Sequence, residues 1–270
     1  MSIKIVAVDM DGTFLNDQMN FDRKRFSTQY SQFKNNGIKF VVASGNQYYQ
    51  LISFFPDIAH GIAFVAENGA YVSNENTEIF CGALSDEYCD KVLKTILPIP
   101  HLDIIVCGKN GAYMLSSSGN TFFTTMSKYY HRLKIIDDFS QVEEPAFKFA
   151  ISLPDEELAG FMKFIEVELA GIVTPVSSGH GSVDLIIPGV HKANGIKILQ
   201  NIWGVKDEEV VTFGDGGNDI EMLQHAGFGF AMANAPDRIK KIAKYQTDSN
   251  NDSGVLNVID KILRKEPPFA

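Results

Sequence analysis

The stretch IKIVAVDMDGT, residues 3–13, decides the fold class. Its first part, Ile3–Val8, is apolar and rich in β-branched residues, and it stops at two carboxylates and a glycine. An apolar run that ends in a polar turn is typical of a strand buried on both faces of a parallel sheet. Ligands of open α/β sheets bind at the carboxyl ends of the strands, so Asp9 and Asp11 are the first candidate site residues.

The segments that follow predict a parallel strand–helix–strand unit. Residues 22–36 are expected to form an amphipathic helix, because Phe26, Tyr30 and Phe33 recur at spacings of four and three. The apolar run 38–43 predicts a second buried strand. A helix between two such strands covers one face of a parallel sheet.

The rest of the chain divides into a middle part and a return to the first pattern. The expected strands are 62–66, short pieces around Tyr71 and Ile79, 103–107, 112–115, 147–153, 172–176, 183–187 and 210–213, and the expected helices are 85–97, 125–131, 155–169, 192–203 and 218–225. Strands that follow one another without helices between them favour antiparallel pairing. We therefore predict an α/β protein: a doubly wound parallel core of residues 1–83 and 188–270, with an inserted α+β cap domain at residues 84–187.

Composition narrows the class of partner. The 270 residues carry 24 Lys and Arg against 33 Asp and Glu, a net charge of −9 that disfavours binding to nucleic acid. No apolar run approaches the roughly 18 to 20 residues of a membrane span. The N-terminal apolar run is too short and too acidic for a signal peptide, so we expect a cytoplasmic protein without a membrane partner. The three cysteines form no CxxC pair, which argues against a disulfide framework or a thiolate metal site.

Polar residues follow three of the expected core strands. They are Asp9, Asp11, Gly12 and Thr13 after the first strand, Ser44, Gly45 and Asn46 after the second, and Asp215, Asn218 and Asp219 after a later one. The carboxyl ends of parallel strands meet at one edge of the sheet, so we expect these side chains to lie together.

Clustered aspartates raise one another's pKa unless a positive charge compensates them. Oxygen ligands without His or Cys favour Mg²⁺ over Zn²⁺, and Mg²⁺ commonly shares its coordination with phosphate. A phosphoryl group also needs donors, and the Ser44 hydroxyl, the Gly45 amide and Lys192 are available. The sequence therefore points to phosphate chemistry.

Each feature alone has a structural explanation. An Asp pair at a strand end is often only turn chemistry, Ser44 is an ordinary N-cap, and Lys192 can be a solvated helix residue. The combination of DMDGT with a second strand-terminal motif, GDGGND at residues 214–219, is much harder to explain in that way.

With these motifs the chain resembles the haloacid dehalogenase-like superfamily of aspartate-nucleophile phosphatases. The matching features are DMDGT at 9–13, SGN at 44–46, Lys192 and GDGGND at 214–219. The insertion between Ser44 and Lys192, ENGA at 67–70 and HKANGI at 191–196 are similar to the Cof-type branch. Within that branch, VVASGNQYYQLISFFP at 41–56 and LIIPGVHKANGI at 185–196 are similar to bacterial sugar phosphatases.

The resemblance implies a role for each matching residue. Asp9 would be the nucleophile that forms an aspartyl phosphate, and Asp11 would be the general acid and base. The implied Mg²⁺ ligands are Asp9, Asp11 through its carbonyl, Asp215 and Asp219; the implied phosphate-binding residues are Asp9, Met10, Asp11, Ser44, Gly45, Asn46, Lys192 and Asn218. His180 and Asp184 are candidate substrate contacts from the cap. Related enzymes often carry Arg where this chain has Asn46.

We therefore expect a Mg²⁺-dependent phosphatase of small phosphorylated metabolites, mainly sugar phosphates, with side activity on esters such as flavin mononucleotide. Its partner would be a small-molecule phosphate ester, and the protein would be a monomer or a weak homodimer. A sugar phosphomutase with the same nucleophile, which isomerises without releasing phosphate, stays open. So does a non-catalytic sugar-phosphate binding protein, although such a protein gains nothing from a nucleophile. A receiver domain lacks the long cap and the Lys192 placement.

Overall fold

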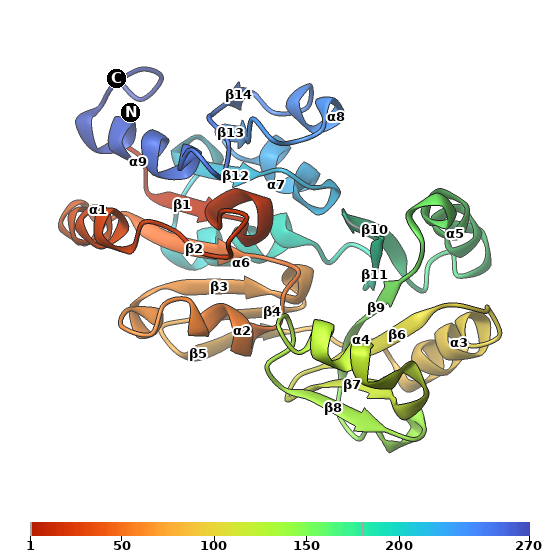
Figure 1. Ribbon diagram of the computed structural model, residues 1–270. Coiled ribbons are helices and arrows are strands. Elements are labelled where there is room, and N and C mark those ends of the chain that lie inside the picture. Colours follow the sequence, from red (N-terminus) through yellow and green to blue (C-terminus); the bar gives the residue numbers. More distant parts are fainter. Residues whose placement is uncertain (1, 180) are drawn as a thin grey trace.

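The strands form two separate sheets. The computed structural model describes residues 2–179 and 181–270. Figure 1 shows the first sheet built from both ends of the chain, in red to orange and in blue, and the second sheet built from the middle, in yellow to green. The insertion of one folding unit into another, predicted from the sequence, is confirmed.

The core sheet has eight strands in the order β14-β13-β12-β1-β2-β3-β4-β5. Their bounds are β1 (Ile5–Val8), β2 (Lys39–Ala43), β3 (Ala63–Ala66), β4 (Tyr71–Asn74), β5 (Thr77–Cys81), β12 (Val210–Gly214), β13 (Phe228–Ala231) and β14 (Tyr245–Gln246). All neighbours from β14 to β3 are parallel, and β3, β4 and β5 pair antiparallel at one edge. β1 is therefore a central strand, which explains why it is apolar at every position.

Helices cover both faces of this sheet. They are α1 (Arg23–Asn36), α2 (Tyr48–Ser53), α6 (Lys192–Trp203), α7 (Ile220–His225), α8 (Asp237–Lys240) and α9 (Gly254–Arg264). Val6 and Val8 pack in the cluster that includes α1, α2 and α9, whereas Ile5 and Ala7 pack against α6 and α7. Successive side chains of a strand point to opposite faces, so this division is the doubly wound arrangement that the sequence predicts.

The second sheet has six strands in the order β10-β11-β9-β6-β7-β8. Its strands are β6 (Asp103–Gly108), β7 (Ala112–Leu115), β8 (Leu133–Ile136), β9 (Ala146–Ser152), β10 (Thr174–Gly179) and β11 (Ser182–Ile186), and its helices are α3 (Asp86–Ile96), α4 (Gly119–Met126) and α5 (Asp155–Glu168). All pairs are antiparallel except β7 with β8. The α+β character predicted for this part is confirmed.

Two local predictions in the cap were wrong. The helix expected at 125–131 lies earlier, at Gly119–Met126, because Phe122, Phe123 and Met126 supply the face that packs on the sheet. The strand β8 was not expected. It is the last strand of its sheet, and its central residues are exposed, so it lacks the apolar pattern of an inner strand.

The cap sheet has two unlike faces. Phe149, Ile151 and Leu185 belong to the cluster packed with α3 and α5. The intervening residues of the same strands point the other way, and there Lys148 and Asp184 lie on one face with Ala150. This second face carries the charged groups that meet the core.

The two crossings between core and cap are adjacent. Gly82, after β5, lies against Ile187, after β11: a Cβ at residue 82 would be 3.2 Å from Cδ1 of Ile187. We therefore propose residues 84–187 as the inserted domain. No helix within the described ranges has both the length and the apolar character of a membrane span.

Candidate active site

Three neighbouring strands of the core sheet end beside one another. β12, β1 and β2 are parallel and hydrogen-bonded in that order. Asp215 lies at the end of β12, Asp9 follows β1, and Ser44 follows β2. The structure therefore brings all three residues to the same edge of the sheet.

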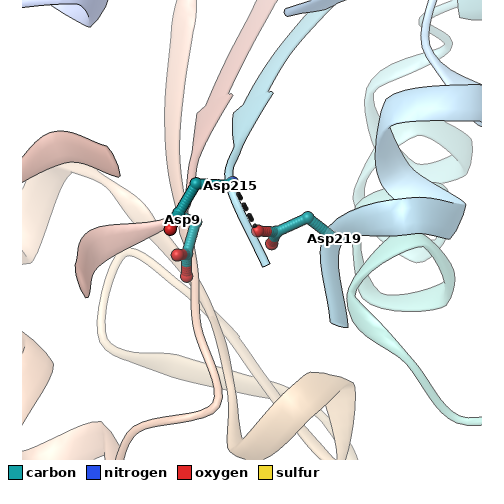
Figure 2. Close-up of side chains that lie close together, drawn as sticks. All are labelled: Asp9, Asp215 and Asp219. Carbon is teal, nitrogen blue, oxygen red and sulfur yellow. Dashed lines mark hydrogen bonds between the residues drawn. The ribbon is translucent and has the colours of Figure 1, made fainter. Parts of the chain in front are cut away.

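A buried lysine links two of three clustered carboxylates. One oxygen from each of Asp9, Asp215 and Asp219 lies within 4.8 Å of the others. Figure 2 shows the three side chains close together. Nζ of Lys192, the first residue of α6, donates to Oδ1 of Asp9 at 2.6 Å and to Oδ1 of Asp219 at 2.7 Å. Lys192 is only 1% exposed, so it is not a solvated helix lysine.

Asp219 anchors the loop that carries Asp215. Its Oδ2 accepts hydrogen bonds from the backbone N–H of Asp215 at 2.9 Å and of Gly216 at 2.8 Å, and the first of these is dashed in Figure 2. With Oδ1 bound to Lys192, both oxygens of Asp219 have protein partners. Asp219 is thus engaged more fully by the chain than Asp215 is.

The loop after β1 contacts the carboxylate of Asp215. Thr13 Oγ1 donates to Oδ1 of Asp215 at 2.7 Å. Gly12 has a φ of +69°, and a Cβ at this position would lie 2.5 Å from Oδ2 of Asp215. Only glycine combines this left-handed backbone with so close an approach.

Burial and mutual repulsion disfavour the ionised forms of the clustered carboxylates. Burial, followed by the charge of Asp219, raises the pKa of Asp9 well above its ordinary value, although Lys192 opposes the shift. Burial and Asp219 also raise the pKa of Asp215 to about 6. Burial disfavours the ammonium of Lys192, but Asp219 and Asp9 outweigh it and raise that pKa. Three carboxylates facing one ammonium leave an excess of negative charge.

These residues fit a hard divalent cation. The donors are carboxylate oxygens, which Mg²⁺ prefers. With all three carboxylates ionised and Lys192 protonated, the cluster has an excess of two negative charges, which one such ion balances. Asp9 and Asp215 are the best placed to hold it, because Asp219 already accepts three hydrogen bonds.

Asp11 is held by a hydrogen bond from Asn46. Nδ2 of Asn46 donates to Oδ2 of Asp11 at 2.5 Å. The other oxygen, Oδ1, is buried and finds no hydrogen-bond partner among the described residues. Burial raises the pKa of Asp11, and the bond from Asn46 opposes that shift. An acid with a raised pKa and one free oxygen suits proton transfer.

The remaining predicted phosphate ligands take different positions. Ser44 is buried, and its Oγ accepts from the backbone N–H of Asn46 at 3.1 Å, which leaves its proton free to be donated. Met10 packs its side chain in the hydrophobic core, so only its backbone can face a ligand. Asn218 donates from Nδ2 to Oδ1 of Asn68 at 3.1 Å.

Of the two predicted cap contacts, only Asp184 is described. It is 3% exposed, and its Oδ2 accepts from Nδ2 of Asn68 at 2.6 Å and from Nζ of Lys148 at 2.8 Å. Contact between Asp184 and a substrate stays a prediction. His180 lies outside the described residues.

Three buried polar residues beside this site were given no role from the sequence: Glu67 and Asn68, which were noted only as part of ENGA, and Lys148. The first two directly follow β3, the strand next to β2, so the rule that singled out the other strand ends also applies to them. Lys148 stands inside the apolar strand AFKFAIS, and a lysine at such a position needs a buried partner.

Comparisons with known proteins agree with this geometry. The sequence pattern of the haloacid dehalogenase-like hydrolase family matches residues 6–259. The chain is 54% identical to the 5-amino-6-(5-phospho-D-ribitylamino)uracil phosphatase YbjI of Escherichia coli, over all of this chain and 99% of that protein.

Solved structures share the whole fold. The crystal structure of SMU.1108c from Streptococcus mutans is 36% identical with a TM-score of 0.94, covering 97% of this chain and 100% of that one. The subclass IIB sugar phosphatase BT4131 is 20% identical with a TM-score of 0.82, covering 95% and 98%. At this identity the second likeness shows the fold alone.

Proposed function

The chain belongs to the haloacid dehalogenase-like hydrolases, and on that premise we propose that it hydrolyses small phosphate monoesters with Asp9 as nucleophile and Mg²⁺ as cofactor. The observation that carries the proposal is the buried Asp9 carboxylate, held by Lys192 beside Asp215 and Asp219. Burying a carboxylate beside two others costs folding free energy, and such clusters are typical of functional sites.

Asp9 forms the covalent intermediate. Lys192 fixes Oδ1, so Oδ2 is the oxygen that attacks phosphorus. A bond forms between this oxygen and phosphorus while the bond from phosphorus to the leaving oxygen breaks. Water then attacks the phosphorus of the aspartyl phosphate, which releases inorganic phosphate and restores Asp9.

Asp11 moves the proton in both halves. Protonated Asp11 gives its proton to the departing alcohol oxygen, and the resulting carboxylate takes a proton from the attacking water. Its raised pKa supplies the protonated form, and Asn46 keeps the carboxyl group in one orientation.

The phosphoryl group needs donors on its other oxygens. Ser44 and the backbone amides of the loops after β1 and β2 supply hydrogen bonds, and Asn218 lies at the same edge. Asp9 and Asp215, with the Asp11 carbonyl, would hold Mg²⁺, and Asp219 would anchor the loop that carries Asp215. When bound, the cation neutralises charge that the phosphoryl oxygens and the carboxylates share.

The substrate class follows from the relatives and from the cap. The Escherichia coli relative is named for a ribityl phosphate, which is the phosphate of an acyclic sugar-alcohol chain joined to an aminouracil. We propose that this chain also takes phosphates carried on a sugar or sugar-derived chain, including that compound. A cap seated over the site excludes bulky phosphoproteins.

The test is phosphate release from a panel of substrates. It contains the ribitylaminouracil phosphate, hexose and pentose phosphates, flavin mononucleotide and p-nitrophenyl phosphate, each with Mg²⁺, with EDTA and with Asp9→Asn. Turnover that is lost in both controls, and is strongest on sugar-chain phosphates, supports the proposal. Isomerisation of a hexose phosphate without phosphate release would instead identify a mutase. If the wild-type protein binds sugar phosphates but neither releases phosphate nor isomerises them, a binding role replaces the proposal.

A further inference from the structure

Contacts from the cap converge on one short segment of the core. Residues 45–50 follow Ser44, and among the described residues three hydrogen bonds join them to the cap. Nζ of Lys148 donates to the carbonyl of Gly45 at 2.7 Å, the backbone N–H of Arg132 donates to Oε1 of Gln47 at 2.9 Å, and Nε2 of Gln50 donates to the carbonyl of Lys128 at 3.4 Å. The cap therefore holds the segment that directly follows the phosphate-site residue Ser44.

Of the three cap residues in these contacts, Lys148 is the buried one. It lies on β9 and is 2% exposed. Besides Gly45, it pairs with Oδ2 of Asp184 at 2.8 Å and lies 3.5 Å from Oε2 of Glu67. Burying an ammonium is costly unless it is paired and hydrogen-bonded. Neutralising Asp184 would offset that cost within the cap alone, yet Lys148 also bonds to a core carbonyl.

The bond to Gly45 has a geometric consequence for Ser44. The carbonyl of Gly45 and the N–H of Asn46 belong to one planar peptide group. Lys148 holds the oxygen of that plane, and the N–H on its other side donates to Oγ of Ser44 at 3.1 Å. Fixing the plane therefore fixes the donor that orients the Ser44 hydroxyl.

Asp184 extends the same control to a second loop. The oxygen that binds Lys148 also accepts from Nδ2 of Asn68, and Oδ1 of Asn68 accepts from Asn218. The backbone N–H of Asn68 donates to the carbonyl of Ser44 at 3.0 Å. Asn68 has a φ of 55°, a left-handed conformation that surrounding contacts must maintain.

We propose that the Lys148–Asp184 pair of the cap is a positioning element of the phosphate site, which orients the Ser44 hydroxyl through the Gly45–Asn46 peptide and Asn218 through Asn68. The proposal rests on the proposed function in assigning Ser44 and Asn218 to the phosphoryl group. It makes phosphate binding, and not only recognition of the leaving group, depend on a seated cap.

The experiment measures binding of inorganic phosphate by calorimetry in the presence of Mg²⁺, using the full chain. Lys148→Met removes the charge and keeps the length of the side chain. We expect phosphate affinity to fall about tenfold, the size of one charge-assisted hydrogen bond. Lys91→Met, at an exposed position of the cap helix α3, is the matched control and should bind as the wild type does.

A double-mutant cycle separates positioning from mere stability. If Lys148 acts through Ser44, then Lys148→Met should cost less than about twofold in a Ser44→Ala background. Turnover of p-nitrophenyl phosphate should show the same non-additivity, mainly in KM. A full tenfold loss in the Ser44→Ala background, or wild-type affinity in Lys148→Met, would overturn the proposal.

A variant that does not fold, and an error in the proposed function, can each be told apart from a failure of the positioning proposal. If Lys148→Met does not fold, Asp184→Asn replaces it in a cycle with Asn218→Ala, because Asp184 reaches the site through Asn68 and Asn218. We then expect a loss of about threefold that Asn218→Ala absorbs. Binding that couples Lys148 to Ser44 in a protein without turnover would refute the phosphatase and keep the positioning role. If Lys148→Met leaves turnover unchanged, the phosphatase stands and the positioning role is refuted. A wild-type protein that binds no phosphate would refute both the phosphatase and the positioning role.

Discussion

Nδ2 of Asn46 lies 2.5 Å from Oδ2 of Asp11, and this bond holds a carboxyl group whose other oxygen has no partner in the described part of the chain. The donor is the neutral side-chain amide of Asn46. It stabilises the ionised carboxylate by one hydrogen bond, without adding a positive charge to the site.

Asn46→Ala should therefore slow turnover and shift its pH profile. We expect kcat to fall about tenfold, because the orientation of Asp11 is lost. The pKa of Asp11 should rise further, since the bond that opposes its upward shift is gone. The limb of the rate profile that reports Asp11 should then move to higher pH. Asn36→Ala, at the exposed end of α1, should leave the profile unchanged; a profile that does not move in Asn46→Ala contradicts the assignment.

Lys192→Met should destabilise the protein strongly. It leaves Asp9 and Asp219 buried without their shared partner, and breaking a buried ion pair in this way costs about 3–5 kcal/mol. Urea denaturation in EDTA measures the free energy of unfolding. Lys197→Met, exposed on the same helix, should change it by less than about 0.5 kcal/mol. Equal losses of unfolding free energy in the two variants would show that the buried pairing of Lys192 with Asp9 and Asp219 does not stabilise the fold more than an exposed lysine does.

Mg²⁺ should stabilise the folded protein through the carboxylate cluster. At about a hundred times the dissociation constant, a ligand specific to the folded state adds about 2.7 kcal/mol to the free energy of unfolding. Thermal melts with Mg²⁺ and with EDTA measure the gain. Asp215→Asn should lose most of it, whereas exposed Asp57→Asn should retain it. A gain that survives in Asp215→Asn would place the ion elsewhere.

Glu67 should make stability fall as the pH rises. Burial raises its pKa from 4.5 to about 7, with Lys148 opposing the shift and Asp184 adding to it. Between these two pH values the unfolded chain has released this proton while the folded chain keeps it, so rising pH favours unfolding by on the order of 3 kcal/mol.

The variant Glu67→Gln should remove this slope. Urea denaturation from pH 4.5 to pH 8 should show the wild type losing stability relative to Glu67→Gln, and exposed Glu166→Gln should follow the wild type. Parallel stability curves for wild type and Glu67→Gln would contradict the raised pKa.

The successful predictions depended on two kinds of pattern: apolar residues at helical spacing, and polar residues at the ends of buried strands. The helix beginning at Lys192 was predicted to the residue, because a polar turn precedes it and apolar residues recur at helical spacing. Asp9, Ser44 and Asp215 could be grouped in advance because parallel strands deliver their ends to one edge. These signals are local, or follow from a general rule of sheets.

Contacts between the two parts of the chain could not be predicted in this way. Lys148 and Gly45 are 103 residues apart, and nothing in either segment specifies the other. The partner of Asn46 was missed for a related reason, since its contact with Asp11 depends on how two loops turn after their strands. The edge strand β8 has too little burial to leave a pattern in the sequence.

The adjacency of Gly82 and Ile187 gives the cap a modular character. Because the chain leaves and re-enters the core at nearly the same point, a short turn from residue 82 to residue 187 would close the core without altering the order of its strands. Evolution can therefore lengthen, exchange or delete the insert while the catalytic edge keeps its geometry. Such a core would retain Asp9, Asp215 and Lys192, but it would lack the lysine that reaches Gly45.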